Sequence, residues 1–322
     1  MVDITKILRR FLCPLVICVL LFGGDCASAE EEIGQNHQQK GPTSFTVKSR
    51  DHEKEDLFSQ AQLVLHARLT SGGESITQGL VWRVYTSAIG VDNKLPLIAT
   101  SEGGSASFNL KAGSYLVHVS FGRATFAQRV DLENGQTLTK NFVLDAGGVI
   151  FDATLLNGAI NKKDLLFTLY EDAKENDDTG VILSNIKPQS IVRLKAGRYH
   201  VVSYYGSINA VVRSDIQVDA GKITEVSLEH QAAQVILKLV RQKGGEALAD
   251  TSWSITNDSG DIIYETAGAY VSLVLVEGDY IAIAKNKDKI YQKTFSVSSG
   301  HDKDVSVVAD TQNMQKIENT VD

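Results

Sequence analysis

Three tyrosines occupy the same position in a recurring phrase, and a phenolic hydroxyl can bind a ligand or hydrogen-bond the protein's own backbone. The phrase is Leu-x-x-Gly-x-Tyr, and it ends at Tyr115, Tyr199 and Tyr280. A tyrosine two residues after a turn glycine is typical of a tyrosine corner, whose hydroxyl bonds to nearby backbone. We therefore predict that these side chains fix turns and do not bind a ligand.

The segment Asn-Asp-Ser-Gly-Asp at 257–261 is rich in oxygen atoms that could bind calcium. A calcium loop needs further acidic ligands at set positions and a closing glutamate. Asn, Asp, Ser and Gly between two strands are also the residues of a hairpin turn. We predict a turn here, and a solvated loop at the acidic segment 175–178.

The seven histidines do not gather at one place in the chain. No pair of them has the spacing of a zinc site on one element. Catalysis has little support either, because Ser71-Gly72-Gly73 lacks the strand and helix that flank a nucleophile elbow. No acidic pair recurs at a spacing that marks an acid–base site. We predict no catalytic residue, no metal and no cofactor, so the protein is not expected to be an enzyme.

Two features could bind a partner. Lys285, Lys287 and Lys289 form a basic hairpin that could contact an anionic envelope polymer or simply be solvated. In Tyr204-Tyr205, alternation along a strand places at least one ring outward. An exposed tyrosine can stack on a sugar or anchor a protein. We take these five residues as candidate contacts, with an envelope protein as the expected partner and polysaccharide as the alternative.

The tyrosine phrase belongs to a longer repeat. Its glycines, at 113, 197 and 278, are 84 and 81 residues apart. Before each glycine an aromatic residue stands in an apolar run, and after each a turn glycine recurs. The aromatic residues are Trp82, Phe167 and Trp253, and the turn glycines are Gly135, Gly221 and Gly300. Features in one order at similar spacing indicate tandem copies of one unit, and Trp82 and Trp253 are predicted to lie in its core.

Each copy has the pattern of short strands. Leu65, Ala67 and Leu69 alternate with polar neighbours, which is typical of a half-buried strand. The first copy contains seven such runs, near 62–70, 79–86, 94–101, 104–110, 114–121, 125–132 and 137–144. Seven short strands separated by turns predict a two-sheet sandwich. The predicted fold class is all-β, with three tandem antiparallel β-sandwich domains.

The repeated phrase and the strands around it resemble the carboxypeptidase regulatory-like and prealbumin-like (Ig-like) sandwiches of exported bacterial proteins. In that family a strand ending in Leu, an Ala-Gly or Pro-Gly turn and a Tyr-x-x-x-Val strand are followed by a final apolar strand. Leu110-Lys111-Ala112-Gly113-Ser114-Tyr115, then Val119, and the later Phe142-Val143-Leu144 fit this order. The resemblance implies a fold and carries little information about function.

The first 29 residues predict export. Lys6, Arg9 and Arg10 precede an apolar run of 14 residues at 11–24, and Ala27-Ser28-Ala29 then gives a signal-peptidase pattern. The run is too short to span a bilayer, which needs about 20 residues. Asp25 disfavours the alternative, a lipoprotein signal at Cys26. We predict cleavage after Ala29 and a periplasmic or secreted protein.

Composition restricts the partners further. The chain has 322 residues and a formal charge of -7, and this acidic balance disfavours nucleic acid, which needs a basic face. All three cysteines lie in the predicted signal, so the mature chain is expected to form no disulfide. The sequence has no second long apolar run, so no membrane span is predicted for the mature chain. The predicted segments are signal peptide 1–29, leader 30–60, repeats 61–146, 147–231 and 232–310, and disordered tail 311–322.

Overall fold

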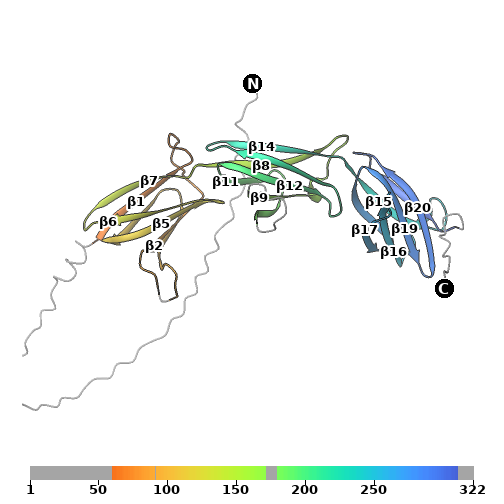
Figure 1. The fold of residues 1–322 in the computed structure, drawn as a ribbon, viewed down its shortest axis with the longest axis horizontal. Helices are drawn as coiled ribbons and strands as arrows, with labels where there is room; N and C mark the ends of the chain where they lie inside the picture. Colours follow the sequence, from red (N-terminus) through yellow and green to blue (C-terminus); the bar gives the residue numbers. More distant parts are fainter. Residues whose placement is uncertain (1–59, 91, 172–179, 311–322) are drawn as a thin grey trace, which may run out of the picture. The chain divides into compact units, whose positions relative to one another are not determined.

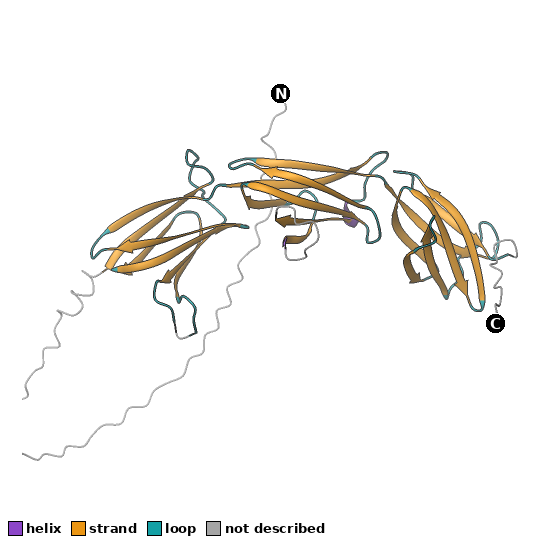
Figure 2. Cartoon of the chain, in the orientation of Figure 1, coloured by secondary structure: helices purple, strands orange, loops and turns teal. Residues whose placement is uncertain are grey.

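The structure is a computed structural model that describes residues 60–90, 92–171 and 180–310. The predicted signal peptide with Ala27 and Ala29, the leader before residue 60, the loop 175–178 and the tail 311–322 lie outside these residues. In the described part the secondary structure is strands and one short 3₁₀ helix, drawn purple in Figure 2 (Figures 1 and 2). The all-β fold class predicted from the sequence is confirmed.

The first sandwich is formed by the strands that follow the predicted leader. Its seven strands are β1 (Gln60–Arg68), β2 (Leu80–Thr86), β3 (Leu97–Gly103), β4 (Ala106–Lys111), β5 (Gly113–Phe121), β6 (Ala124–Leu132) and β7 (Thr137–Val143). They form the sheets β4-β1-β7 and β3-β2-β5-β6. The seven runs predicted for this copy each overlap one of these strands.

The second sandwich has the same order of elements plus the short helix. Its strands are β8 (Ala146–Leu155), β9 (Leu165–Glu171), β10 (Val181–Ile186), β11 (Ile191–Lys195), β12 (Gly197–Tyr205), β13 (Val211–Val218) and β14 (Ile223–His230), with helix η1 (Lys162–Asp164) before β9. They form the sheets β11-β8-β14 and β10-β9-β12-β13.

The third sandwich repeats this topology. Its strands are β15 (Ala232–Val240), β16 (Thr251–Asn257), β17 (Ile262–Ala267), β18 (Tyr270–Val276), β19 (Gly278–Asn286), β20 (Lys289–Val297) and β21 (Lys303–Val308). They form the sheets β18-β15-β21 and β17-β16-β19-β20. In all three sandwiches the first strand pairs in parallel with the last, and the other pairs are antiparallel.

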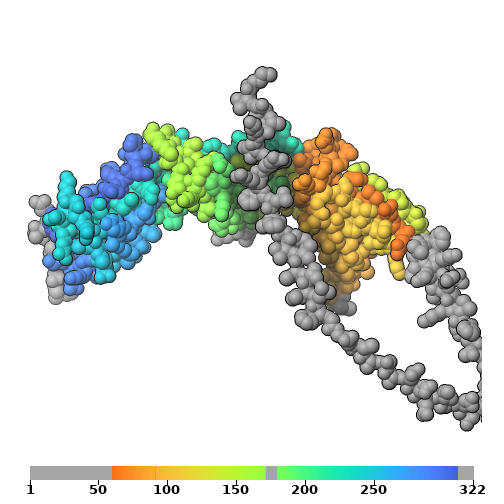
Figure 3. Space-filling model, turned by 180° about the vertical axis from the view of Figure 1, so that it is seen from behind, coloured from red at the N-terminus to blue at the C-terminus, as the bar shows by residue number. Residues whose placement is uncertain are grey.

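Each sandwich is built around its own hydrophobic core. Strand β1 alternates buried and less buried residues, as period-2 patterning requires. Trp82 and Trp253 are at most 1% exposed, so their predicted core position is confirmed, and Phe167 at the corresponding position is also fully buried. Figure 3 shows that the surface of each sandwich comes from one continuous stretch of the sequence.

The tyrosine corners are also confirmed. The hydroxyls of Tyr115 and Tyr199 each donate to the carbonyl oxygen four residues earlier, at 2.7 Å, and that of Tyr280 does so at 2.8 Å. These bonds tie the strand that begins at the repeated glycine back to the end of the preceding strand. The turn glycines Gly135, Gly221 and Gly300 have φ angles of 70°, 75° and 72°, a region that favours glycine.

The two joints between sandwiches use one hydrogen-bond pattern. At the first, the N–H of Ala196 donates to Asp145 O at 2.7 Å and that of Gly221 to Ala146 O at 2.8 Å. At the second, the N–H groups of Glu277 and Gly300 donate to Gln231 O and Ala232 O, both at 2.9 Å. The linking peptide is therefore bonded to the following sandwich at both joints.

Candidate functional site

The hairpin after each tyrosine strand ends in a tip, which we call the tip hairpin. In the first sandwich this is the turn between β5 and β6. Its Arg123 N–H donates to Arg193 O on β11 at 2.9 Å, and the Arg193 guanidinium lies 4.5 Å from the centre of the Phe121 ring. A Cβ on Gly122 would lie 2.8 Å from Arg193 Cβ. A glycine is therefore required for this close contact.

The tip hairpin of the second sandwich makes the corresponding contact with the third. A Cβ on Gly206 would lie 2.8 Å from Val274 Cβ on β18. Asn209, just after the tip, donates from Nδ2 to the Tyr280 hydroxyl and accepts from Val276 N–H, both at 3.1 Å. Arg193 and Val274 occupy the same place, four residues before the repeated glycine.

The predicted contact Tyr205 does not face solvent. It is 2% exposed, its ring lies edge-on to His230 at 5.9 Å, and its hydroxyl accepts from Asn161 N–H at 3.4 Å. Burial is the largest cause that raises the Tyr205 pKa. Tyr204 is partly exposed and lines a hollow of about 270 Å³ with Leu166 and Ile208. One of the two rings faces outward, as strand alternation predicts.

The predicted contacts Lys285, Lys287 and Lys289 form the tip hairpin of the third sandwich. All three are exposed, and none forms an ion pair with another described residue. Lys287 has a φ of 54°, a left-handed conformation that is unfavourable for lysine. The two separate binding features of the sequence are thus the same hairpin in successive repeats.

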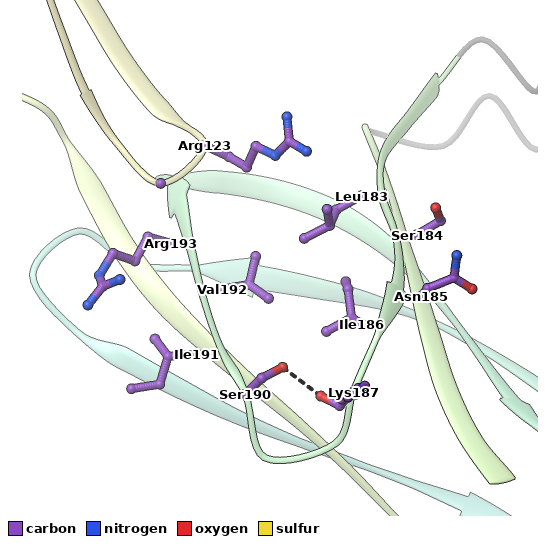
Figure 4. Close-up of a pocket in the computed structure, with 11 residues that line it drawn as sticks. Arg123, Leu183, Ser184, Asn185, Ile186, Lys187, Ser190, Ile191, Val192 and Arg193 are labelled. Atoms are coloured by element: carbon purple, nitrogen blue, oxygen red, sulfur yellow. Dashed lines mark hydrogen bonds between the residues drawn. The ribbon is translucent and has the colours of Figure 1, made fainter. Parts of the chain in front are cut away.

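A groove of about 540 Å³ lies where the first tip hairpin meets the second sandwich (Figure 4). Leu183 and Ile186 of β10 point toward Val192 of β11 across the groove. Arg123 lies at one end and Lys187 with Ser190 at the other, where Ser190 Oγ donates to Lys187 O at 2.6 Å (Figure 4). Its lining includes three basic residues and no acidic one.

The sandwich that contains the groove differs from the other two at its core aromatic residue. Trp82 and Trp253 donate from Nε1 to the carbonyl oxygens of Gly104 and Gly268, at 2.8 and 2.9 Å. These glycines begin the turn between the third and fourth strands of their sandwiches. The side chain of Phe167 has no N–H to donate. The pairing of β10 with β9 contains two register shifts, whereas the pairings of β3 with β2 and of β17 with β16 contain one register shift each. The replacement of tryptophan by phenylalanine in the second repeat was visible in the sequence, but the groove in that sandwich was not.

The other polar candidates have structural partners. The Nε2 of His230 lies 2.8 Å from Ser203 Oγ in the core, and burial lowers the His230 pKa from 6.5 to about 4. His200 lies 2.8 Å from Asp215. Among the described residues no group of three or more His, Cys, Asp or Glu side chains could hold a metal ion.

The segment 257–261 forms the predicted turn between β16 and β17. The Asn257 N–H donates to Asp261 O at 3.0 Å, and the Asp261 N–H donates to Asn257 Oδ1 at 2.8 Å. Gly260 takes a φ of 86°. Turn chemistry therefore accounts for these oxygen-rich side chains.

In the described residues no helix has the length and apolar character needed to cross a membrane. A family model described as a Rhizobiales growth-associated tandem repeat domain matches residues 234–309, within the third sandwich. No curated protein matches the chain.

Several solved structures are similar at low identity. The Bacillus anthracis TIE protein is 14% identical over 78% of this chain, with a TM-score of 0.23, and the matched part is 50% of that protein. The minor pilin GBS52 of Streptococcus agalactiae is 16% identical over 53% of this chain and 95% of its own, with a TM-score of 0.30. The major pilin BcpA of Bacillus cereus is 8% identical over 78% of this chain and 100% of its own, with a TM-score of 0.23. At these identities the likeness concerns the fold alone.

Proposed function

We propose that this protein is an exported, non-enzymatic structural and interaction protein of the bacterial cell envelope, periplasmic or secreted, that serves cell growth. The observation that carries the proposal is the repeated joint: the same backbone bonds link three sandwiches in series. The export signal predicted for residues 1–29 supports the location. The description of the matched family as growth-associated supports the process.

The polar residues that lie together have structural duties, which supports a non-enzymatic role. Asp152 accepts from Lys162 Nζ at 2.7 Å and from Gln189 Nε2 at 3.2 Å, so it ties the β10–β11 turn to β8. Ser203 and His230 lie together without a carboxylate hydrogen-bonded to His230 Nδ1 among the described residues. A nucleophile and base with a third orienting group are therefore not assembled there.

The groove beside β11 is the contact surface that we assign to a protein partner. Leu183 and Val192 offer an apolar floor, and Arg123 and Lys187 lie at its two ends. Protein interfaces commonly combine an apolar core with a polar rim. A partner segment with an apolar side chain between acidic ones fits this arrangement.

The first test is export and growth. N-terminal sequencing of the envelope form should show a chain that starts at Glu30, and Ala27→Lys with Ala29→Lys should retain the precursor. A strain that lacks the protein should grow slowly and recover with the wild-type chain. Recovery by a chain held in the cytoplasm would contradict the proposal.

The second test addresses the groove. Arg123→Glu with Lys187→Glu should reduce both growth rescue and in vivo crosslinking to the partner, because the ends of the groove then repel acidic groups. Lys94→Glu with Lys243→Glu is the matched control, since both lysines are exposed elsewhere. Equal rescue by the two double variants would remove the groove from the proposal.

A carbohydrate- or envelope-polymer-binding module is the second candidate. Tyr204, partly exposed beside its hollow, favours it. Tyr204→Ala should weaken retention on envelope polysaccharide, whereas Tyr270→Ala, at a side chain that is 64% exposed, should not. Equal retention of both variants and the wild type would exclude this site.

Two finer assignments complete the proposal. We assign the sandwiches to the carboxypeptidase regulatory-like group on the repeated Leu-x-x-Gly-x-Tyr phrase. We also keep 61–146, 147–231 and 232–310 as the domain limits. Limited proteolysis should release fragments that end near these limits if each sandwich folds as a unit.

A further inference from the structure

Two elements of each sandwich could contact a following one: the tip hairpin and the loop after the first strand. In the following sandwich these would meet the fourth strand and the turn before the last strand, which we call the receiving end. The first two tip hairpins contact Arg193 and Val274 on the fourth strands, as described above. The loop residues Thr70 and Asn157 contact the turns at Gly221 and Gly300.

The receiving ends of the second and third sandwiches are filled. A Cβ on Gly221 would lie 3.0 Å from Thr70 Cγ2. A Cβ on Gly300 would lie 1.3 Å from the backbone oxygen of Asn157, so no side chain fits there without movement. The preceding sandwich therefore packs directly on each of these turns.

The receiving end of the first sandwich keeps the same features but is not covered by a described residue. A Cβ on Gly135 would meet nothing within 4 Å, although its φ of 70° matches those of Gly221 and Gly300. Asn109, which corresponds to Arg193 and Val274, is exposed on β4. Asn109 is not too large for docking, because Arg193 at the corresponding position has a longer side chain and still accepts a tip hairpin.

The tip hairpin of the third sandwich lacks the aromatic residue and the glycine that the other two tips share. Asn286 stands where Phe121 and Tyr205 place aromatic rings, and Lys287 stands where Gly122 and Gly206 lie. The Asn286 amide turns toward its own sandwich and donates to Ala249 O at 2.7 Å and to Thr251 Oγ1 at 3.1 Å.

Lys287 excludes the contact by its size. The glycines at this place leave 2.8 Å between an added Cβ and the receiving strand, so a lysine would collide with backbone-near atoms. Lys287 also keeps a positive φ of 54° that glycine would adopt without strain. A non-glycine residue held in this conformation indicates a requirement other than local stability.

We propose that the receiving end of the first sandwich is a docking site for the aromatic–glycine tip hairpin of another β-sandwich, and that Asn286 and Lys287 prevent a second copy of this chain from filling it. The occupant is defined by complementarity, since the two filled receiving ends in this chain both hold such a tip. The inference does not depend on the proposed function. Polar residues at an end of a repeat array commonly prevent unlimited stacking.

The probe is the full mature chain with Asn286→Tyr and Lys287→Gly, which carries the tip sequence of the second sandwich. Analytical ultracentrifugation over a concentration series should show that it self-associates at least about tenfold more tightly than the wild type. Labelled wild-type chain should also bind this variant, because docking needs the aromatic–glycine tip on only one of the two chains. Wild type alone should stay monomeric.

A blocking variant shows where the tip docks. Gly135→Asn retains the turn, because asparagine tolerates a positive φ, but it adds a side chain at the receiving end. Combined with the tip substitutions, it should abolish self-association. Self-association that survives Gly135→Asn would overturn the proposal.

A single variant controls for misfolding caused by the substitution of Asn286. Because Asn286 holds the loop 249–251, Lys287→Gly alone provides a variant that keeps those hydrogen bonds. It removes the collision and should associate more weakly than the double variant but more strongly than the wild type. If both open-tip variants remain monomeric up to millimolar concentration while their circular dichroism is native, the receiving end is not such a site.

Discussion

The second sandwich differs from the first and third at the residue that holds the turn between the third and fourth strands. Trp82 and Trp253 donate an indole N–H to that turn, whereas Phe167 cannot. The β10–β11 turn is held by a backbone bond instead. The N–H of Gln189 in this turn donates to Phe151 O on β8 at 2.8 Å. One core substitution thus accompanies an open edge between the two sheets and an apolar groove there.

The sandwiches also differ at their ends. The second contacts neighbours at both ends, through Arg193 and Gly206. In the first, no described residue covers the turn at Gly135, and the third has a tip that carries Lys287. The repeats therefore share a core but have been adapted at their surfaces, which explains why identical folds in one chain need not have identical roles.

The largest expected effect tests the indole bond. Trp82→Ala should destabilise the first sandwich by about 3–5 kcal/mol, because it empties a fully buried site. Trp82→Phe should cost less and should accelerate amide exchange in the turn at 104–105, since that turn then resembles the one in the second sandwich. Hydrogen exchange followed by mass spectrometry resolves the sandwiches separately. Unchanged exchange in the Phe variant would show that the indole does not hold the turn.

Acid should weaken the second sandwich more than the others. Burial lowers the pKa of His230 to about 4 in the folded state, below its ordinary 6.5, so folding disfavours the protonated ring. The stabilisation is full above pH 6.5, falls as the pH drops toward 4, and amounts to at most about 3 kcal/mol. His230→Gln, which does not titrate, should flatten this dependence in thermal melts between pH 7 and pH 4. An equally steep loss in that variant would assign the acid effect to other groups.

A matched glycine pair compares Gly300, which the preceding sandwich covers, with Gly135, which no described residue covers. Gly300→Ala and Gly135→Ala both place alanine at a φ near 70°, so both share a strain of about 1 kcal/mol. Gly300→Ala must also displace Asn157, which adds about 1–3 kcal/mol by overpacking. Urea unfolding of the two variants measures the difference. Equal losses would mean that the contact at Gly300 contributes nothing to stability.

The fold could be predicted from the sequence because each strand carries its own signal. Alternation in β1, the glycine before each tyrosine strand and the aromatic residue in each second strand are local patterns, and they recur three times. The tyrosine corners followed from the position of Tyr115, Tyr199 and Tyr280, each two residues after a glycine. The parallel pairing of β1 with β7 was not evident, because it depends on where the chain returns after six strands.

The candidate site was less predictable because it depends on contacts between distant segments. Tyr205 belongs to an apparently exposed Tyr-Tyr-Gly tip, but packing against His230 buries it. The groove joins residues of the first tip hairpin with those of β10 and β11. Aligning the three tips would have shown Lys287 opposite two glycines, and that was the available signal for the role that we propose for the third tip.

The smallest expected effect compares two tyrosine corners. Among the described residues the Tyr115 hydroxyl bonds only within the first sandwich, whereas the Tyr280 hydroxyl also accepts a bond from the second sandwich. Tyr115→Phe and Tyr280→Phe each remove a hydroxyl bond to backbone, worth about 1 kcal/mol. Tyr280→Phe also removes the acceptor of Asn209 Nδ2 at the second joint. It should therefore increase exchange at Val276, whose N–H is bonded to Asn209, while Tyr115→Phe leaves that amide unchanged.

A double-mutant cycle isolates this contribution. If the Tyr280 hydroxyl stabilises the joint through Asn209, the losses from Tyr280→Phe and Asn209→Ala should add to more than the loss in the double variant, because each single change breaks the same bond. Urea unfolding of the four chains gives the coupling. Strict additivity would mean that the hydroxyl acts only within its own corner. The third sandwich would then be held at that joint by backbone bonds, by the bond from Val276 N–H to Asn209 and by the packing of Gly206 on Val274.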